Sequence, residues 1–75
     1  MNYKAHIESH SDVMLGKPVI KGTRLTVELI IQRMSEGASV PQLLEAYPSL
    51  KQEDIFAALA YVADVISNER IIAVA

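Results

Sequence analysis

The sequence predicts a mainly α-helical domain, a trihelical helix-turn-helix preceded by a short N-terminal β segment. Three segments within residues 26–67 have apolar side chains at helical spacing. Capping residues, glycine and proline separate these segments from one another. Upstream, turn-forming residues lie between two β-prone pieces. The 75 residues therefore divide into a β/turn arm over 1–25, a helical core over 26–67 and a tail over 68–75, all within one domain.

The arm is organised by residues 16–27, which read Gly-Lys-Pro-Val-Ile-Lys-Gly-Thr-Arg-Leu-Thr-Val. The pair Lys21-Gly22 separates two β-prone pieces, and turn chemistry between such pieces indicates a tight reversal or hairpin. Gly22 can take the positive φ that such a reversal often needs. Three cations lie on or beside this turn: Lys17, Lys21 and Arg24.

Upstream of this turn, loosely alternating residues predict a short strand around Tyr3 to Glu8, followed by a Ser-His-Ser-Asp loop. Side chains with metal-binding groups recur there at every second residue: His6, Glu8, His10 and Asp12. On a strand they share one face, and imidazole and carboxylate groups are competent metal ligands. Because a metal site also needs closed geometry and supporting hydrogen bonds, we interpret them as the solvated face of an edge strand. We expect no metal.

The first helix is expected to begin after Thr26, whose hydroxyl can cap exposed backbone N–H groups. Glu28 then lies in the first turn, where the helix dipole favours an anion. Gly37 is expected to end the helix as a C-terminal cap. The buried stripe follows helical spacing: Val27, Ile30, Ile31 and Met34.

The second helix is expected to begin at Ser39, which forms a capping-box pattern with Gln42. Pro48 ends it near Tyr47, because the residue before a proline avoids the helical conformation. Only Gly37-Ala38 lie between the first two helices, so the chain must change direction sharply. The apolar stripe of this short helix is Val40, Leu43, Leu44 and Tyr47.

The third helix follows the turn at residues 49–51 and is apolar nearly all round. One stripe runs along residues 55, 59, 62 and 66, and a second along residues 56, 60 and 63. Such a helix is buried on more than one side, and a chain this short lacks the residues to cover it. We therefore expect a partner surface, most economically in a homodimer, with the tail pairing as a strand or fraying. The candidate interface residues are Phe56, Ala60, Ala63, Ile71, Ile72 and Val74.

Composition restricts the function classes. The chain has no cysteine and a net charge of −2, and its N-terminus lacks the apolar core of a signal peptide. We therefore expect a cytoplasmic protein without disulfides or strong nonspecific nucleic-acid binding. The charge is uneven, with +3 over residues 17–33 and −5 over residues 34–69. Neither a cysteine nucleophile nor a glycine-rich phosphate loop is present, so we expect no enzymatic activity and no cofactor.

In trihelical DNA-binding domains the last helix inserts its N-terminal residues into the major groove. Here Gln52 is suited to an adenine edge, and Lys51 to a guanine or a phosphate. Glu53 and Asp54 oppose this interpretation, since they face the same phosphates. Both carboxylates are equally explained as complements to the helix dipole.

Several motifs together resemble the domain of unknown function 433 family. They are the Gly-Lys-Pro-Val-Ile-Lys-Gly-Thr-Arg run, Glu36-Gly37-Ala38-Ser39, Leu43-Leu44, Tyr47-Pro48 and Glu53-Asp54-Ile55 with Ala57-Ala58-Leu59, within about residues 5–66. The resemblance implies a homeodomain-like helical fold and a role as the antitoxin of a VapB-like pair, beside a PIN-like ribonuclease toxin. Lys51 departs from the family pattern, because a capping Thr or Ser is usual before the Glu-Asp pair.

The leading hypothesis is therefore a non-enzymatic antitoxin-like module that dimerises, binds double-stranded operator DNA and blocks a ribonuclease. In this hypothesis Lys17, Lys21 and Arg24 contact phosphates. The alternative for these cations is a solvated hairpin in which Arg24 bonds nearby carbonyls or carboxylates. The alternative for the whole protein is an interaction adaptor without a nucleic-acid role.

Overall fold

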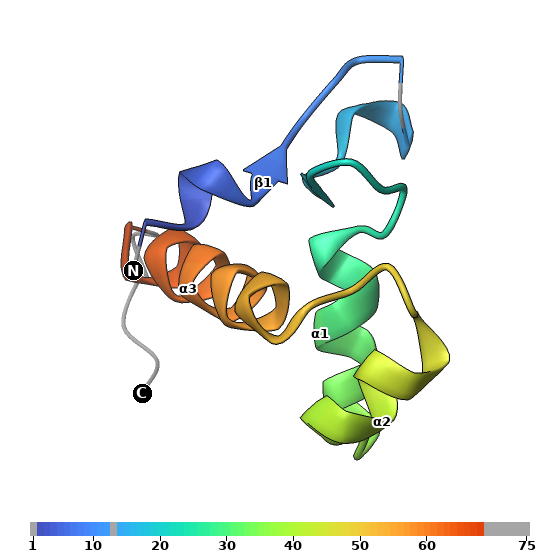
Figure 1. Ribbon diagram of the computed structural model, residues 1–75. Helices are drawn as coiled ribbons and strands as arrows, with labels where there is room; N and C mark the ends of the chain where they lie inside the picture. Colours follow the sequence, from blue (N-terminus) through green and yellow to red (C-terminus); the bar gives the residue numbers. More distant parts are fainter. Residues whose placement is uncertain (1, 13, 69–75) are drawn as a thin grey trace.

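The computed structural model describes residues 2–12 and 14–68. Figure 1 shows three helices and a small sheet, which agrees with the fold class that the sequence predicts. The elements follow in this order: 3₁₀ helix η1 (Tyr3–Ala5), strand β1 (Ile7–Glu8), 3₁₀ helix η2 (Met14–Gly16), strand β2 (Val19–Ile20), and helices α1 (Val27–Ser35), α2 (Val40–Ala46) and α3 (Gln52–Asn68). No helix in this described part of the chain is long and apolar enough to cross a membrane.

The strand predicted at Tyr3 to Glu8 is shorter than expected. Its first half forms η1, because the Asn2 side chain accepts from the Lys4 N–H at 3.2 Å and caps a helical turn. The strand that remains, β1, pairs antiparallel with β2, with Ile7 opposite Ile20. The sheet thus joins the N-terminal residues to the arm that precedes the helices.

The reversal predicted at Lys21-Gly22 is present, and Gly22 has a φ of +81°. The Ile20 N–H donates to the Leu25 carbonyl at 2.8 Å, as in a hairpin. The second half of that hairpin is not a regular strand, because the Thr23 hydroxyl takes up the backbone groups there. It donates to the Ile20 carbonyl at 2.8 Å and accepts from the Leu25 N–H at 3.0 Å. Pairing resumes as a single bridge between Val19 and Thr26.

Local capping sets the bounds of α1 and α2. The Thr26 hydroxyl accepts from the Leu29 N–H at 3.0 Å at the start of α1. Beyond its end, Gly37 has a φ of +104°, and the Ala38 N–H returns to the Arg33 carbonyl at 3.0 Å. This is the 6→1 hydrogen bond of a Schellman motif. The predicted capping box then opens α2, with Ser39 and Gln42 bonded to each other in both directions.

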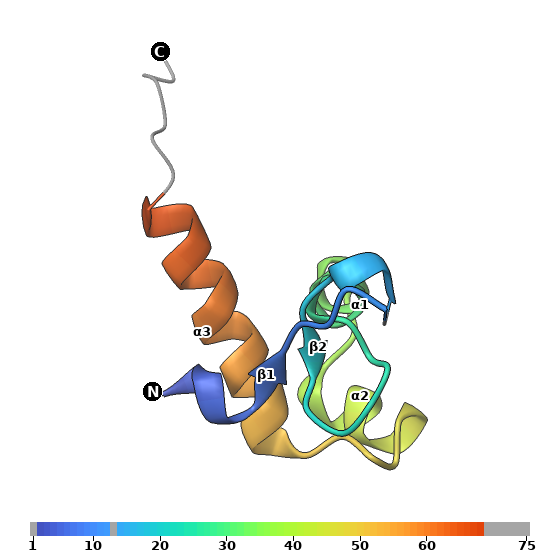
Figure 2. The same cartoon turned by 90° about the horizontal axis from the view of Figure 1, so that it is seen from above.

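The core lies where β2, the three helices and the α2–α3 turn meet. Its buried members are Ile20, Val27, Ile30, Leu43, Leu50, Ile55 and Ala58. In Figure 2 the second half of α3 extends beyond the region where α1, α2 and the sheet gather. Two large apolar side chains of that second half, Val65 and Ile66, remain exposed, and so do Phe56 and Leu59 in the first half of the helix. The strand expected in the tail lies outside the described residues.

Candidate nucleic-acid interface

Asp54 fixes the start of α3. Its Oδ2 accepts from the Lys51 backbone N–H at 3.0 Å, which is the carboxylate half of a capping box. Its Oδ1 lies 3.2 Å from His6 Nδ1, so the same carboxylate also binds the N-terminal arm. The Asp54 side chain is only 13% exposed. Asp54 therefore faces the interior of the molecule, and of the two first-turn carboxylates only Glu53 is exposed.

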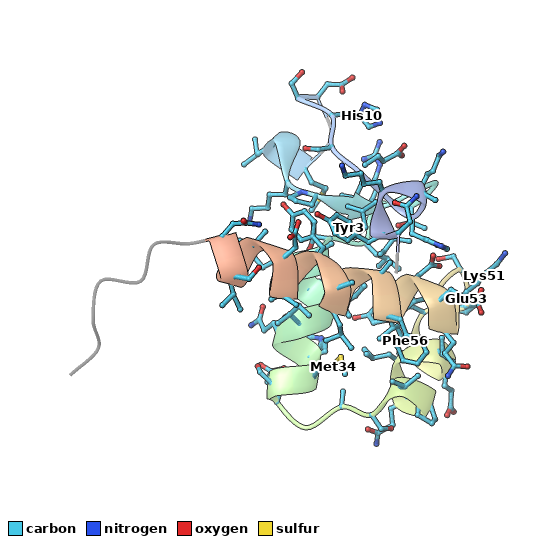
Figure 3. All side chains as sticks on the ribbon, turned by 90° about the vertical axis from the view of Figure 1, so that its left-hand side faces the viewer. Tyr3, His10, Met34, Lys51, Glu53 and Phe56 are labelled. Atoms are coloured by element: carbon cyan, nitrogen blue, oxygen red, sulfur yellow. The ribbon has the colours of Figure 1, made fainter. Side chains whose placement is uncertain are left out.

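The exposed start of α3 presents Lys51 and Gln52 to solvent. Neither side chain has a hydrogen bond or an ion pair with another residue in the described part of the chain. Phe56, one turn further along, is 46% exposed. Figure 3 shows Lys51 and Glu53 together at one end of α3, with Phe56 on the opposite flank of the helix from Tyr3. The residues that the sequence assigned to base reading are thus available to a ligand.

The arm brings Lys21 to the same place. The Lys21 backbone N–H donates to the His6 carbonyl at 2.7 Å, which holds the turn beside β1. Lys21 and Lys51 then line one open depression of about 270 Å³. Its other lining residues include Ser49, His6 and the two carboxylates, Glu53 and Asp54. Two cations that are 30 positions apart in the sequence thereby border one polar surface at the start of α3.

The other two candidate cations have different surroundings. Lys17 Nζ lies 3.2 Å from Oε1 of Glu28, so its charge is matched by the acidic residue that begins α1. Arg24 is exposed, and its side chain has no hydrogen bond or ion pair with another residue among those described. The alternative in which Arg24 holds the turn against the helices requires a bond from its guanidinium to a carbonyl or carboxylate. Among the described residues, no such bond is present.

The four residues with metal-binding groups do not gather at one point. His6 turns toward Asp54 of α3, whereas His10 Nε2 lies 3.4 Å from Glu8 Oε2. Figure 3 shows His10 far from the start of α3. Within residues 2–12 and 14–68 there is no group of three or more histidine, cysteine, aspartate or glutamate side chains with the arrangement of metal ligands.

A second contact between the arm and α3 involves Tyr3. Its hydroxyl donates to Asp64 Oδ2, and its ring meets that of Tyr61 edge to face, with centroids 5.5 Å apart. The hydrogen bond to Asp64 raises the pKa of Tyr3 above its usual value, and partial desolvation adds to this effect. Together with the His6–Asp54 pair, this contact fastens the N-terminal residues along α3. No pattern in the sequence indicates either pair.

The candidate interface residues of α3 differ in their surroundings: Ala60 and Ala63 border a depression that Tyr3 and Lys4 of the arm also line, and Phe56 is 46% exposed. Ala63 is exposed and Ala60 is half-buried. Ile71, Ile72 and Val74 lie outside the described residues. The apolar surface on α3 is thus present, and its extension into the tail stays a prediction.

Comparison with known proteins agrees with this architecture. The family described as "Protein of unknown function (DUF433)" matches residues 7–62. The uncharacterized protein y4eO of Sinorhizobium fredii (strain NBRC 101917 / NGR234) is 40% identical over 55 residues, which are 73% of this chain and 25% of that protein. The crystal structure of a DUF433 member from Anabaena variabilis ATCC 29413 is similar, with a TM-score of 0.79 and 31% identity. That similarity covers 83% of this chain and 61% of the crystallised one, so both relatives are longer than the part they share with it.

Proposed function

The chain belongs to the DUF433 family, and on that premise we propose that it is a small non-enzymatic antitoxin-like module. It dimerises, binds operator DNA and neutralises a PIN-like ribonuclease toxin. The observation that supports DNA binding most strongly is the exposed start of α3. There Lys51 and Gln52 lead the last helix of a trihelical domain, and Lys21 borders the same depression.

In this proposal the start of α3 enters the major groove. Gln52 reads an adenine edge, and Lys51 binds a guanine or a nearby phosphate. Lys21 and Arg24 bind phosphates and set the orientation of the domain without reading sequence. Lys17 contributes less than these two, because Glu28 already pairs with it. Asp54 lines the same depression, but its carboxylate is only 13% exposed and is bonded to the Lys51 N–H and the His6 ring, so it opposes a phosphate less than the exposed Glu53 does.

The ribonuclease partner would bind the acidic helical half of the molecule. Exposed carboxylates there include Glu36 and Glu45. A nuclease must have a cationic groove for its substrate, and complementary charge steers and orients such a complex. The cationic turn and the acidic helices thus serve two different partners.

DNA binding is tested by fluorescence anisotropy with a duplex from the region upstream of the protein's own gene and a scrambled duplex. We expect Lys51→Ala to weaken binding to both duplexes by a similar factor if Lys51 binds a phosphate, and to weaken binding to the upstream duplex more if it reads a guanine. Gln52→Ala should reduce the preference for the upstream duplex, by about 1–3 kcal/mol. Lys4→Ala, which removes an exposed cation of η1, is the matched control and should change neither. Equal losses in all three variants would contradict a role for the start of α3.

The protein partner is tested by a tagged pull-down from the source cell, divided into nuclease-treated and untreated halves. A small ribonuclease-like protein in both halves, with upstream DNA in the untreated half alone, is the expected result. A different protein partner without DNA would exclude the repressor role. The function would then be that of an interaction adaptor, which the exposed apolar side chains of α3 also favour.

A further inference from the structure

One face of α3 is exposed and apolar along most of the helix. We call it the α3 seam, and its four residues, spaced by three, four and three positions, are Phe56, Leu59, Ala63 and Ile66. That spacing matches the a and d positions of a heptad repeat. The large members remain 46%, 38% and 51% exposed for Phe56, Leu59 and Ile66, whereas Ile55 and Ala58 are fully buried in the core. The seam thus holds three of the four exposed large apolar side chains of α3, and the fourth, Val65, lies on the side of the helix that faces Val27 and Glu28 of α1.

We propose that the α3 seam packs against the α3 seam of a second copy, with the two helices antiparallel. This inference deepens the dimerisation in the proposed function and rests on it. Antiparallel packing about a two-fold axis is an isologous contact, in which each copy uses the same residues. The axis would pass beside the middle of α3, between Leu59 and Ala63.

The sizes of the seam residues favour the antiparallel arrangement. It places Leu59 opposite Ala63 of the second copy and Phe56 opposite Ile66, so that the inner layers combine a large side chain with a small one. A parallel pair would instead place alanine against alanine between two layers of large residues. That layer would be underfilled, and underfilled layers destabilise a packed interface.

The charges of α3 also favour a second copy as the occupant. Between residues 55 and 67 of α3, the one charged side chain is that of Asp64, and the seam and the positions beside it there, which include Ala60, Val62 and Ser67, are uncharged. Depletion of charge is the compositional mark of an interface core. Of the acidic residues described in α3, Asp54 and Asp64 are bonded to the arm, and Glu53 lies in the first turn, before the first seam residue. Two copies therefore meet without placing carboxylates in the contact.

The length of the seam indicates a weak dimer. Four side chains in each copy cover less than the roughly 800 Å² per partner of a standard interface. We therefore expect dissociation at low concentration. DNA that holds two copies side by side would raise their effective concentration and complete the pairing.

The arrangement also sets the distance between the two DNA-reading ends. With a rise of about 1.5 Å per residue, the two starts of α3 would lie roughly 30 Å apart. Two half-sites one helical turn apart on DNA are roughly 34 Å apart, centre to centre. The pair is therefore suited to an operator with two inverted half-sites separated by one turn.

The orientation is tested by disulfide cross-linking without DNA. The chain has no cysteine, so each variant carries a single one. A mixture of Leu59→Cys and Ala63→Cys proteins should form more disulfide-linked dimer than either variant forms by itself. Only opposed positions approach within about 7 Å between Cα atoms, and residue 59 of one copy is opposed to residue 63 of the other. A mixture of Phe56→Cys and Ile66→Cys tests the outer layers in the same way. Glu53→Cys, exposed on α3 away from the seam, is the control.

The outcomes separate the seam from the proposed function. Circular dichroism first establishes that each variant is folded, and the second cysteine pair replaces the first if one variant is not. The antiparallel seam would be overturned if Leu59→Cys alone cross-linked as efficiently as the mixture. It would also be overturned if the mixture gave no more cross-linked dimer than Glu53→Cys does. Mixed dimers from a protein that binds no operator DNA would support the seam and contradict the repressor role. DNA binding by the wild type, without cross-linked mixed dimers of the cysteine variants, would support the repressor role and contradict the seam.

Discussion

Asp54 connects two segments that are remote in the sequence, because one carboxylate binds both the Lys51 N–H and the His6 ring. We expect Asp54→Ala to lower the free energy of unfolding by about 1–3 kcal/mol, since a buried acceptor and two hydrogen bonds are lost. Glu53→Ala is the matched control, as an adjacent exposed carboxylate, and should change the stability by no more than about 0.5 kcal/mol. Urea unfolding followed by circular dichroism measures both. Equal effects would show that dipole complementarity alone explains the pair.

Tyr3 gives the arm a dependence on alkaline pH. Its hydroxyl must be protonated to donate to Asp64, and that hydrogen bond raises its pKa above 10.0. A raised folded-state pKa means that the stabilisation is fully present below the unfolded-state pKa of about 10 and is lost as the pH rises through the folded value. The melting temperature of the wild type should therefore exceed that of Tyr3→Phe at neutral pH. The difference should disappear in strongly alkaline solution, and a difference that is independent of pH would contradict this role.

At the scale of the elements, α1 and α2 could be predicted because their ends depend on residues a few positions away. The capping hydrogen bonds of Thr26 and of the Ser39–Gln42 box join residues only three positions apart. The residue types at these positions therefore indicate where each helix starts. The reversal at Lys21-Gly22 is local in the same sense. Such bonds need no knowledge of the rest of the fold.

The pairs that position the candidate site could not be predicted in this way. His6 and Asp54 are 48 residues apart, and Tyr3 and Asp64 are 61 apart. No spacing in the sequence marks either pair. The burial of α3 also depends on residues remote in the sequence. Its periodicity indicates two apolar stripes, but it does not indicate which side of the helix the arm and α1 cover. Only the fold distinguishes the buried Ile55 from the exposed Leu59.

The turn between α1 and α2 depends on one glycine. Gly37 has a φ of +104°, and an added Cβ would meet no atom within 4 Å, so a substitution acts through the backbone alone. We expect Gly37→Ala to destabilise the protein by about 1–2 kcal/mol, and Gly37→Asn by less, because asparagine tolerates the left-handed region better. Thermal unfolding measures both variants. An alanine variant as stable as the wild type would show that the helix ends without the Schellman motif.

At the scale of the whole molecule, the protein should associate through the α3 seam. The average mass in sedimentation equilibrium should rise with concentration above the 8.3 kDa of one chain. Ile66→Asp places a charge on the seam at a side chain that is already 51% exposed, so it should keep the mass at that of the monomer without unfolding the domain. Gln32→Asp adds the same charge to the exposed surface of α1 and should leave association unchanged. A constant monomer mass in the wild type at every concentration would contradict self-association.

The salt dependence of DNA binding is the sharpest test of a nucleic-acid interface at the start of α3. Wild-type protein is titrated onto the upstream duplex at several salt concentrations, and log K is plotted against log salt concentration. We expect a linear decrease with a slope of about −0.9 for each phosphate that is bound. Lys51→Ala should make that slope shallower by about 1. Absence of binding at low salt, or a slope that Lys51→Ala leaves unchanged, would contradict a nucleic-acid interface at the start of α3.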